Sequence, residues 1–381
     1  MKNKKIKICH VAHKLTGKSD GVFTHLKMLL ELLNKDKFEQ ILIYSGNERK
    51  IDDYAKSLNV KVYKIPELNN KIPLNSFFKI IRIFLKEDVD IIHTHLVKPY
   101  IIAGLINLLL NRKLIFNYQG VFITSKYYSR FERIILKFLH RIVQFRGNNI
   151  LAIGPSKASI EELKREAKFQ YYSYYYNGFR INSFKNELDQ SIYIHLTGLK
   201  QNYFLVGIVA RHEKQKRLDI ALKILKALHE NRLNIFFVFI GDGPLMNNTK
   251  IEAYKMGISE KCLFIEYLTN LPSYLRLFDL VLFTSEWEGF PLTIWEAMYN
   301  EVPVVSSDVG GVKEILENEN CGLVYPFGEV EKCVNIIKEL YFDRERLKVL
   351  GKNGRKSILE KYNEKHFKEF FETLYLDLSN E

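Results

Sequence analysis

The stretch EWEGFPLTIWEAM, residues 286–298, places two glutamates, Glu288 and Glu296, around a turn-like Gly-Phe-Pro. The apolar run LVLFT precedes it and predicts a buried strand, so both glutamates should follow the carboxyl end of that strand. Leu292 and Thr293 would open a helix whose free amides and dipole favour an anion. A capping box made by Thr293 and Glu296 explains the second glutamate equally well. The pair alone therefore leaves a chemical and a structural role open.

Three further loops that follow predicted strands carry residues suited to phosphate. ARHEKQKRLD follows the run 203–210, and its Arg211 and Lys216 could bind a diphosphate, although cations after a strand are usually only solvated. IGDGPL contains Gly241 and Gly243, which permit a tight turn with close backbone approach, although a plain turn is the commoner meaning. SSDVGGVKEI places a glycine pair at the start of another helix. Ligands of open parallel sheets bind beyond the carboxyl ends of the strands, so these loops should line one site.

Apolar β-rich runs alternate with longer helical patterns in both halves, which predicts two doubly wound α/β domains with parallel sheets. The predicted strands are 5–11, 39–44, 60–64, 90–93, 113–117 and 149–153 in the first half, and 203–210, 235–240, 262–265, 280–284, 303–306 and 322–324 in the second. Residues 181–200 are polar and irregular, which places the domain boundary there. The segment 363–379 predicts a helix with an apolar face beyond the second sheet.

Together these residues resemble the retaining nucleotide-sugar glycosyltransferases of group 1, also called family 4. The resemblance is dense over 203–325, where EGFPLTIWEAMYNEVPVVSSDVGGVKEIL and NCGLVY follow the loops described above. It is thinner over 1–180, where DGVFTHL, DIIHTH, GPSKASIEEL and YNGF stand at the expected intervals. The resemblance implies the glycosyltransferase B (GT-B) fold, with two facing Rossmann-like domains and a last helix that returns to the first. It implies an acceptor-side domain at 1–185, a donor domain at 186–362 and the returning helix at 363–381.

The resemblance also implies roles for individual residues. Glu288 would face the transferred sugar and support positive charge at its anomeric carbon, while Arg211 and Lys216 would neutralise the departing diphosphate. Glu296 would accept hydrogen bonds from the ribose hydroxyls. The remaining residues implied at the donor site are Gly21, Gly241, Gly243, Phe290, Pro291, Leu292 and Thr293. Because cations of the chain neutralise the diphosphate, the resemblance implies neither a metal nor a cofactor, and the nucleotide-sugar is a substrate.

The chain departs from the family pattern at three positions. The glycine pair of the first loop is Asp20-Gly21 here, and the usual His-Gly after strand 113–117 is Gln119-Gly120. Glutamine can hydrogen-bond a sugar hydroxyl but cannot take a proton at neutral pH. The glycine usual after Lys216 is Arg217, which adds charge near the diphosphate.

Two histidines in IIHTHLVKP, His93 and His95, are two apart on a predicted strand and therefore share a face. No third ligand has a suggestive spacing, so the sequence predicts no metal site. We expect His95 to line the acceptor side of the cleft or to be hydrogen-bonded in it, with Gln119 nearby.

The excess of positive over negative charge is confined to the first half of the chain. Residues 1–180 carry 32 Lys and Arg against 15 Asp and Glu, net +17, whereas the rest carries 25 against 29, net −4. Within the first half, residues 122–146 (FITSKYYSRFERIILKFLHRIVQFR) interleave cations with aromatic and aliphatic side chains. Such a helix could lie on an anionic bilayer or be a domain helix with a solvated face. The net charge of +17 on residues 1–180 favours the interpretation that this helix lies on an anionic bilayer.

Other features bear on the cellular compartment. The apolar window 100–110 is too short to span a bilayer, and the opening MKNKKIKICHVAHKL resembles a first buried strand and not a signal peptide. The four cysteines show no metal-binding or redox spacing, which favours reduced thiols in the cytoplasm.

These observations predict a cytoplasmic enzyme, peripheral on the inner face of the cell membrane. It would be a retaining, metal-independent glycosyltransferase that moves a sugar from a UDP-sugar to a hydroxyl of a lipid-linked saccharide or surface glycan. The first alternative is a nucleotide-sugar epimerase on the same fold. The second is a basic nucleic-acid-binding protein, which leaves the two glutamates and the strand-end loops unexplained.

Overall fold

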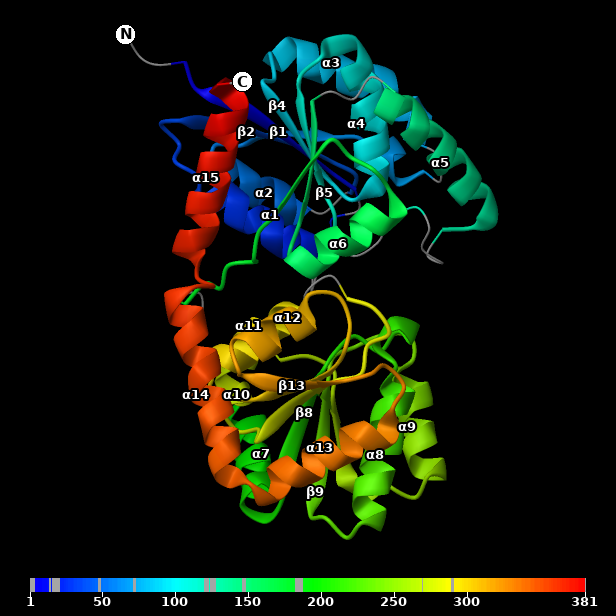
Figure 1. Ribbon diagram of the computed structural model, residues 1–381, viewed down its shortest axis with the longest axis vertical. Coiled ribbons are helices and arrows are strands. Elements are labelled where there is room, and N and C mark those ends of the chain that lie inside the picture. Colours follow the sequence, from blue (N-terminus) through cyan, green and yellow to red (C-terminus); the bar gives the residue numbers. More distant parts are fainter. Residues whose placement is uncertain are drawn as a thin grey trace. The chain divides into compact units, whose positions relative to one another are not determined.

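The computed structural model describes residues 4–13, 15, 21–46, 49–70, 73–119, 123, 128–145, 149–181, 188–268, 270–288 and 291–380. The chain forms two compact units: unit 1 contains Met1–Gly178 and Glu364–Glu381, and unit 2 contains Phe179–Asn363 (Figure 1). The boundary predicted between residues 185 and 186 thus falls between Gly178 and Phe179. Phe179 enters unit 2 because its N–H donates to the Tyr362 carbonyl (2.8 Å) and its ring packs on Tyr299 (centroids 5.0 Å apart).

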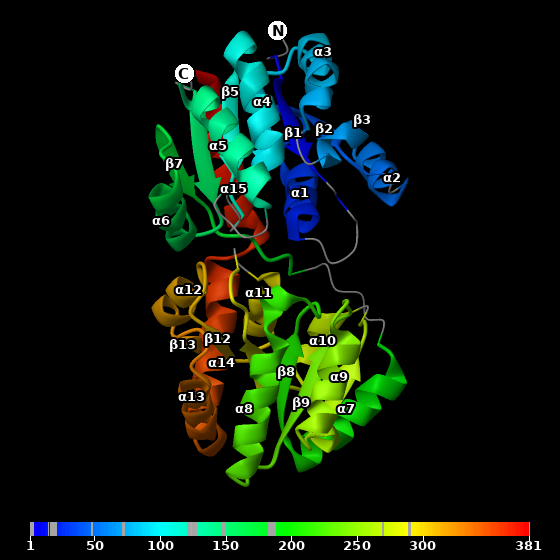
Figure 2. The same cartoon turned by 90° about the vertical axis from the view of Figure 1, so that its right-hand side faces the viewer.

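Unit 1 is built on a seven-stranded sheet of order β3-β2-β1-β4-β5-β6-β7, with parallel pairing throughout. Its strands are β1 (Ile6–Ala12), β2 (Phe38–Tyr44), β3 (Lys61–Lys64), β4 (Ile91–His95), β5 (Lys113–Asn117), β6 (Ile150–Gly154) and β7 (Tyr171–Tyr174). Its helices are α1 (Gly21–Leu32), α2 (Arg49–Ser57), α3 (Phe77–Glu87), α4 (Val97–Leu110), α5 (Arg130–Phe145), α6 (Lys157–Glu166) and α15 (Glu364–Asn380), with short turns η1 (Pro66–Asn69) and η2 (Pro73–Ser76). Successive strand residues point to opposite faces, so helices cover both faces. The core on one face contains α3, α4, α5 and α6, and the core on the other contains α1 and α15 (Figures 1 and 2).

Unit 2 is built on a six-stranded parallel sheet of order β10-β9-β8-β11-β12-β13. Its strands are β8 (Phe204–Val209), β9 (Ile235–Ile240), β10 (Cys262–Ile265), β11 (Leu280–Phe283), β12 (Val304–Ser307) and β13 (Gly322–Tyr325). Its helices are α7 (Gln190–Asn202), α8 (Leu218–Glu230), α9 (Met246–Lys255), α10 (Leu271–Leu275), α11 (Leu292–Tyr299), α12 (Val312–Asn318), α13 (Val330–Phe342) and α14 (Arg344–Glu360), with turns η3 (Lys214–Lys216) and η4 (Ser259–Lys261). The two sheets confirm the predicted α/β class with two Rossmann-like domains.

Two elements contradict the sequence-based expectation. β7 carries four residues, YYSY, whose outer two are exposed and whose inner two are partly buried, so it lacks the apolar run of a central strand. α7 occupies much of the segment expected to be irregular. Asp189 caps it by accepting hydrogen bonds from the N–H groups of Ser191 (2.9 Å) and Ile192 (3.2 Å). Only Leu196 of α7 is buried, which explains why the sequence shows no sustained helical period there.

The last helix confirms the predicted return to the first domain. α15 buries Phe367, Phe371 and Tyr375, which stand four residues apart and therefore share one face. These rings belong to the same core cluster as Ile8 of β1 and Ile91 of β4. The apolar stripe of α15 thus completes one face of the sheet of unit 1, although the chain has already built the whole of unit 2.

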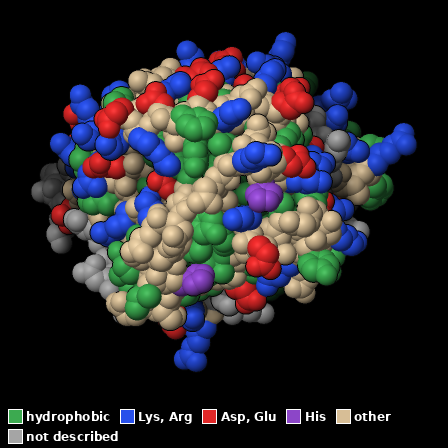
Figure 3. Space-filling view, turned by 90° about the horizontal axis from the view of Figure 1, so that it is seen from below, with side chains coloured by type: hydrophobic (Ala, Val, Ile, Leu, Met, Phe, Trp, Pro, Cys, Tyr) green, Lys and Arg blue, Asp and Glu red, His purple; other side chains and the backbone are tan. Residues whose placement is uncertain are grey.

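One face of unit 2 carries both kinds of charge. Figure 3 shows the face that lies lowest in Figure 1, where Lys and Arg side chains are interspersed with Asp and Glu. No described helix is both long and apolar enough to cross a bilayer. All four cysteines are free thiols.

Candidate active site

Two neighbouring strands of unit 2 deliver the candidate residues. β8 and β11 are hydrogen-bonded neighbours in parallel register, so the loops after Val209 and Phe283 leave the same edge of the sheet. Three hydrogen bonds to backbone carbonyls join the described parts of these loops: Glu286 N to Gln215 O (2.8 Å), Gln215 Nε2 to Trp287 O (2.7 Å) and Thr284 Oγ1 to Lys216 O (2.8 Å). The cations of the first loop and the acids of the second therefore lie together, as the sequence analysis predicted.

Lys216 and Glu288 form the centre of this arrangement. Lys216 Nζ donates to Glu288 Oε1, and the two side chains are 19% and 9% exposed. Ser285 Oγ donates to the same carboxylate oxygen at 2.7 Å, and the Ser285 carbonyl in turn accepts from Ser307 Oγ at 2.7 Å. Among the described residues nothing binds Glu288 Oε2. The carboxylate is thus fixed through one oxygen and presents the other.

The two arginines of the first loop are placed differently. Arg211 is 57% exposed and pairs with Glu213 (Nη2 to Oε1, 2.8 Å). Arg217 donates to both carboxylate oxygens of Asp219, each at 2.9 Å. Its backbone is left-handed (φ +48°), a conformation that glycine adopts without strain. The charge that Arg217 adds near Lys216 is therefore paired with the Asp219 carboxylate.

The Gly-Asp-Gly turn after β9 packs against the cation loop. Gly241 has φ +137°, and a Cβ there would stand 2.2 Å from the Ala210 carbonyl oxygen. A Cβ on Gly243 would stand 2.7 Å from both the nitrogen and the oxygen of His212. The His212 N–H donates to the Asp242 carbonyl at 2.9 Å. In the structure these glycines thus let two loops touch, which holds Arg211 and Lys216 in place.

α11 places Glu296 one turn inside a helix that begins at Leu292. Its N-cap residue is Pro291, and no side chain accepts a hydrogen bond at the cap. The capping box of Thr293 and Glu296 is therefore wrong, because Thr293 already lies within the helix. Glu296 is partly buried, and its carboxylate has no partner among the described residues. Burial raises the pKa of this carboxyl to about 7. A partly buried carboxylate that no described residue occupies can accept hydrogen bonds from hydroxyl groups of a ligand.

Several predicted positions carry less structural information. Phe290 lies outside the described residues. Gly310 has φ +54°, and Gly311 is the N-cap of α12. In unit 1, Gly21 is the first residue of α1, and a Cβ there would meet nothing within 4 Å. Gln119 is partly exposed after β5.

The prediction for His95 is corrected by the structure. His95 is fully buried, and its Nε2 lies 3.4 Å from His10 Nδ1. Its ring lies on the face of the sheet that α1 covers, where it contacts the His25 ring (centroids 5.7 Å apart). The side chain is therefore inside unit 1 and does not line a cleft.

The residues that sequence reasoning missed are polar partners. Ser285 orients Glu288 and Gln215 joins the two loops, yet a serine or glutamine in a loop is usually only solvated. Ser285 directly follows the predicted strand 280–284 and Gln215 lies in the loop after 203–210, and this position is the one signal that pointed to them.

Comparisons with known proteins identify the family and the fold. The model of Glycosyltransferase Family 4 matches residues 19–170, and that of Glycosyl transferases group 1 matches residues 191–357. The UDP-Gal:alpha-D-GlcNAc-diphosphoundecaprenol alpha-1,3-galactosyltransferase of Escherichia coli is 25% identical, and the alignment covers 98% of this chain and 97% of that protein. The capsular polysaccharide biosynthesis glycosyltransferase CapM of Staphylococcus aureus is 22% identical, with 91% and 92% covered. Among solved structures, Anabaena HepE in complex with UDP has a TM-score of 0.77 at 20% identity, with 97% of this chain and 99% of that chain covered. The two matches together span most of both units, so the chain belongs to the group 1 glycosyltransferases and has their fold.

Proposed function

We propose that this enzyme transfers a sugar, with retention of anomeric configuration, from a UDP-sugar to a hydroxyl of a lipid-linked saccharide or surface glycan. The observation that carries the proposal is the fixed Lys216–Glu288 pair, with one free carboxylate oxygen, at the shared edge of β8 and β11. Such a pair offers a cation for a departing diphosphate and an anion for a sugar. Both charges are preorganised, which is the condition for electrostatic stabilisation of a transition state.

In this proposal the donor lies across the loops of unit 2. Lys216 and Arg211 neutralise the diphosphate as it leaves, which is why the reaction needs no metal ion at that point. The unpartnered carboxylate of Glu296 accepts hydrogen bonds from the ribose hydroxyls. The free N–H groups of Leu292 and Thr293, which follow Pro291 at the start of α11, bind phosphate or sugar. Glu288 faces the sugar ring and stabilises the positive charge that develops at the anomeric carbon.

The proposed reaction proceeds on one face of the sugar. The bond between the anomeric carbon and the diphosphate oxygen breaks, and the acceptor oxygen forms its new bond from the same side. The departing phosphate oxygen takes the acceptor proton, so no general base of the protein is required. Glu288 fits this mechanism as a stabilising anion, because its Oε1 is already bound by Lys216 and Ser285.

The relatives support the choice of donor and acceptor. The E. coli relative is named for UDP-galactose and for a diphosphoundecaprenol-linked acceptor, and the structurally similar HepE holds UDP. A polyprenyl-linked acceptor resides in a membrane. We therefore include in the proposal a cytoplasmic enzyme that binds the inner face of the cell membrane.

The surface of α5 supports membrane binding. Its apolar stripe is exposed: Phe131 67%, Ile134 61%, Phe138 62%, Ile142 37% and Phe145 90%. These residues follow a spacing of three and four and so share one side of the helix. Arg130, Arg133, Lys137 and Arg141 accompany the stripe, whereas Lys126 and Arg146 lie outside the described residues. Apolar rings among cations match an anionic bilayer, at about 1 kcal/mol per cation near its surface.

The donor is tested by thermal shift with UDP, GDP and their sugar conjugates, because a ligand that binds only the folded state raises the melting temperature. We expect UDP and one UDP-sugar to stabilise the protein. Stabilisation by GDP alone would contradict the proposed donor. Incubation with the identified UDP-sugar and a polyprenyl-diphosphate saccharide should give a product with the donor's anomeric configuration by NMR. Formation of an epimer without any acceptor would instead identify a nucleotide-sugar epimerase.

The membrane part is tested by flotation with phosphatidylglycerol and phosphatidylcholine vesicles. We expect binding to the anionic vesicles only, weakened about tenfold by Phe138→Ser. Phe342→Ser is the matched control, since Phe342 is a 70% exposed phenylalanine on α13 of unit 2. Equal loss in both variants, or equal binding to both lipids, would remove α5 from the proposal.

A further inference from the structure

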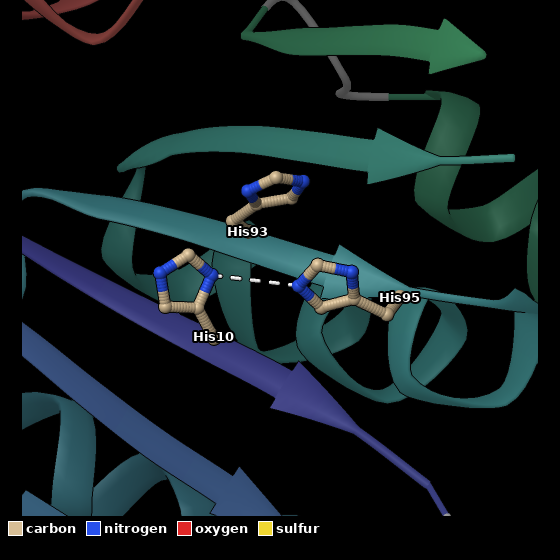
Figure 4. A group of neighbouring side chains, drawn as sticks. All are labelled: His10, His93 and His95. Atoms are coloured by element: carbon tan, nitrogen blue, oxygen red, sulfur yellow. Dashed lines mark hydrogen bonds between the residues drawn. The ribbon is translucent and has the colours of Figure 1, made fainter. Parts of the chain in front are cut away.

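Three histidines meet inside unit 1, on the face of the sheet that α15 covers. His10 on β1 is the register partner of His93 on β4, and His95 follows two residues later on the same face. All three side chains are fully buried. Each offers one ring nitrogen, and these three atoms lie within 4.8 Å of one another (Figure 4). The spacing argument missed this group because only the parallel pairing of β1 with β4 brings His10 to the pair.

Hydrogen bonds fix which nitrogen of His10 is available. His10 Nε2 lies 3.1 Å from Gln40 Oε1, and Gln40 Nε2 donates to the Leu30 carbonyl at 3.2 Å. The amide oxygen of Gln40 must therefore face His10, and His10 Nε2 carries the proton that it accepts. The lone pair of His10 is then on Nδ1, directed toward His95 Nε2 at 3.4 Å.

The other two rings have nitrogens without a partner. His93 Nδ1 is bonded to the Tyr375 hydroxyl of α15 at 2.7 Å, whereas His93 Nε2 is buried and has no hydrogen bond. His95 Nδ1 is also buried without a hydrogen bond. Buried polar atoms normally have partners, so these nitrogens indicate a missing group.

We propose that His10, His93 and His95 bind one imidazole-preferring transition-metal ion, of the Zn²⁺ or Cu⁺ kind, which fastens α15 to the sheet of unit 1. Gln40 and Tyr375 would be the outer partners that orient the first and second of these rings, as such partners do in known histidine sites. The rings must move closer on binding, since two nitrogens that each lie about 2.0–2.1 Å from one ion are at most about 4.2 Å apart. The ion has no part in sugar transfer, whose proposed residues belong to unit 2, so this inference stands apart from the proposed function.

The charge of the site distinguishes the two ions. The group contains no carboxylate among the described residues, so a bound ion keeps its full charge in a buried place. A dication without a counter-ion is costly there, which favours Cu⁺ over Zn²⁺ unless hydroxide accompanies the zinc. Anaerobic titration with Cu⁺ and parallel titration with Zn²⁺ therefore answer which ion is bound.

The test uses the full-length chain after chelation. We expect one ion per chain by mass spectrometry, a raised melting temperature on loading, and three imidazole ligands by X-ray absorption. Tyr375→Phe keeps the packing of α15 but removes the hydroxyl, and should weaken binding at least about tenfold. His93→Gln with His95→Gln should abolish binding. His229→Gln, a histidine of α8 in unit 2, should change nothing.

Three results would overturn the inference. One is a folded wild-type chain that binds neither ion. Another is the same stoichiometry in the double histidine variant. The third is binding that Tyr375→Phe leaves unchanged. If the double variant does not fold, the comparison of Tyr375→Phe with wild type decides alone, because that variant preserves the ring packed among Phe371 and Phe38.

Discussion

The two units place polar residues at different points along equivalent strands. In both sheets the first strand of the unit lies between its second and fourth strands, so β1 and β4 of unit 1 correspond to β8 and β11 of unit 2. In unit 1 the unusual residues, His10, His93 and His95, lie within the strands and are buried beneath helices. In unit 2 Lys216 and Glu288 lie several residues beyond the strand ends. A side chain within a strand that helices cover can contact only the protein interior. A side chain in the loop that follows the strand can contact a ligand.

Glu288→Gln is the substitution from which we expect the largest effect, a loss of turnover. The substitution removes the anion that faces the sugar, so turnover should fall about 100-fold or more while nucleotide affinity changes by less than about threefold. Steady-state kinetics and calorimetry with UDP measure the two quantities. Glu286→Gln is the control, since Glu286 is a neighbouring exposed glutamate whose closest cation, Arg217, is 3.9 Å away. Full activity in the Glu288 variant would contradict its proposed role.

Two glycines test how tightly the loops after β9 and β2 are packed. Gly241 follows β9 and Gly46 follows β2, the equivalent strand, and both have positive φ (+137° and +157°). A Cβ would stand 2.2 Å from the Ala210 oxygen at Gly241, but no nearer than 3.0 Å to any atom at Gly46. Gly241→Ala should therefore cost about 2–4 kcal/mol and Gly46→Ala about 1–2 kcal/mol in urea unfolding. Equal costs would show that the loop of unit 2 is no more tightly packed than its counterpart.

Glu296→Gln tests a charge whose effect depends on pH. Burial raises the pKa of the folded carboxyl from 4.5 to about 7, so the folded state holds its proton more tightly than the unfolded state. Glu296 therefore costs stability as the pH rises from about 4.5 to about 7, and the cost is complete above that window. The glutamine variant should match wild type at pH 4 and be more stable at pH 8, by up to about 3 kcal/mol. Unfolding at both pH values measures this difference, and an equal difference at each would remove the buried charge as its cause.

The same substitution should weaken the nucleotide. Ribose hydroxyls donate most strongly to an ionised carboxylate, so wild-type affinity should rise between pH 6 and pH 8. The glutamine variant should bind about tenfold more weakly at pH 8 and lose this rise. An affinity that Glu296→Gln leaves unchanged would place the ribose elsewhere.

Arg217 gives the smallest expected effect. Arg217→Gly relieves a left-handed backbone worth about 1 kcal/mol but loses the pair with Asp219, whose value at the surface is about the same. The variant should therefore unfold within about 1 kcal/mol of wild type. Arg217→Ala loses the pair and keeps the strain, so it should be the less stable of the two by about 1 kcal/mol. Equal stability of the Arg217→Ala and Arg217→Gly variants would mean that the backbone at this position is unstrained.

Strands were the most predictable part of the fold. Each central strand is a short apolar run bounded by polar residues, so the run IFFVFI gave β9 with its observed bounds, 235–240. β7 was missed because its Tyr171 and Tyr174 are exposed. α7 was missed because it buries one residue. Hydrophobic periodicity arises where one face of an element is buried, and edge strands and surface helices bury few residues.

The two parallel sheets and the last helix could be predicted from hydrophobic periodicity alone. The meeting of the 211–217 loop with Glu288 could also be predicted, because loops that follow parallel strands leave the same edge of the sheet. Only the tertiary structure decided how the side chains are used. In the structure Arg217 pairs with Asp219, and no capping box forms at Glu296. His95 is buried, and His10 lies beside it. Those outcomes depend on contacts between residues far apart in the chain, and the spacing of residue types along one sequence does not contain them.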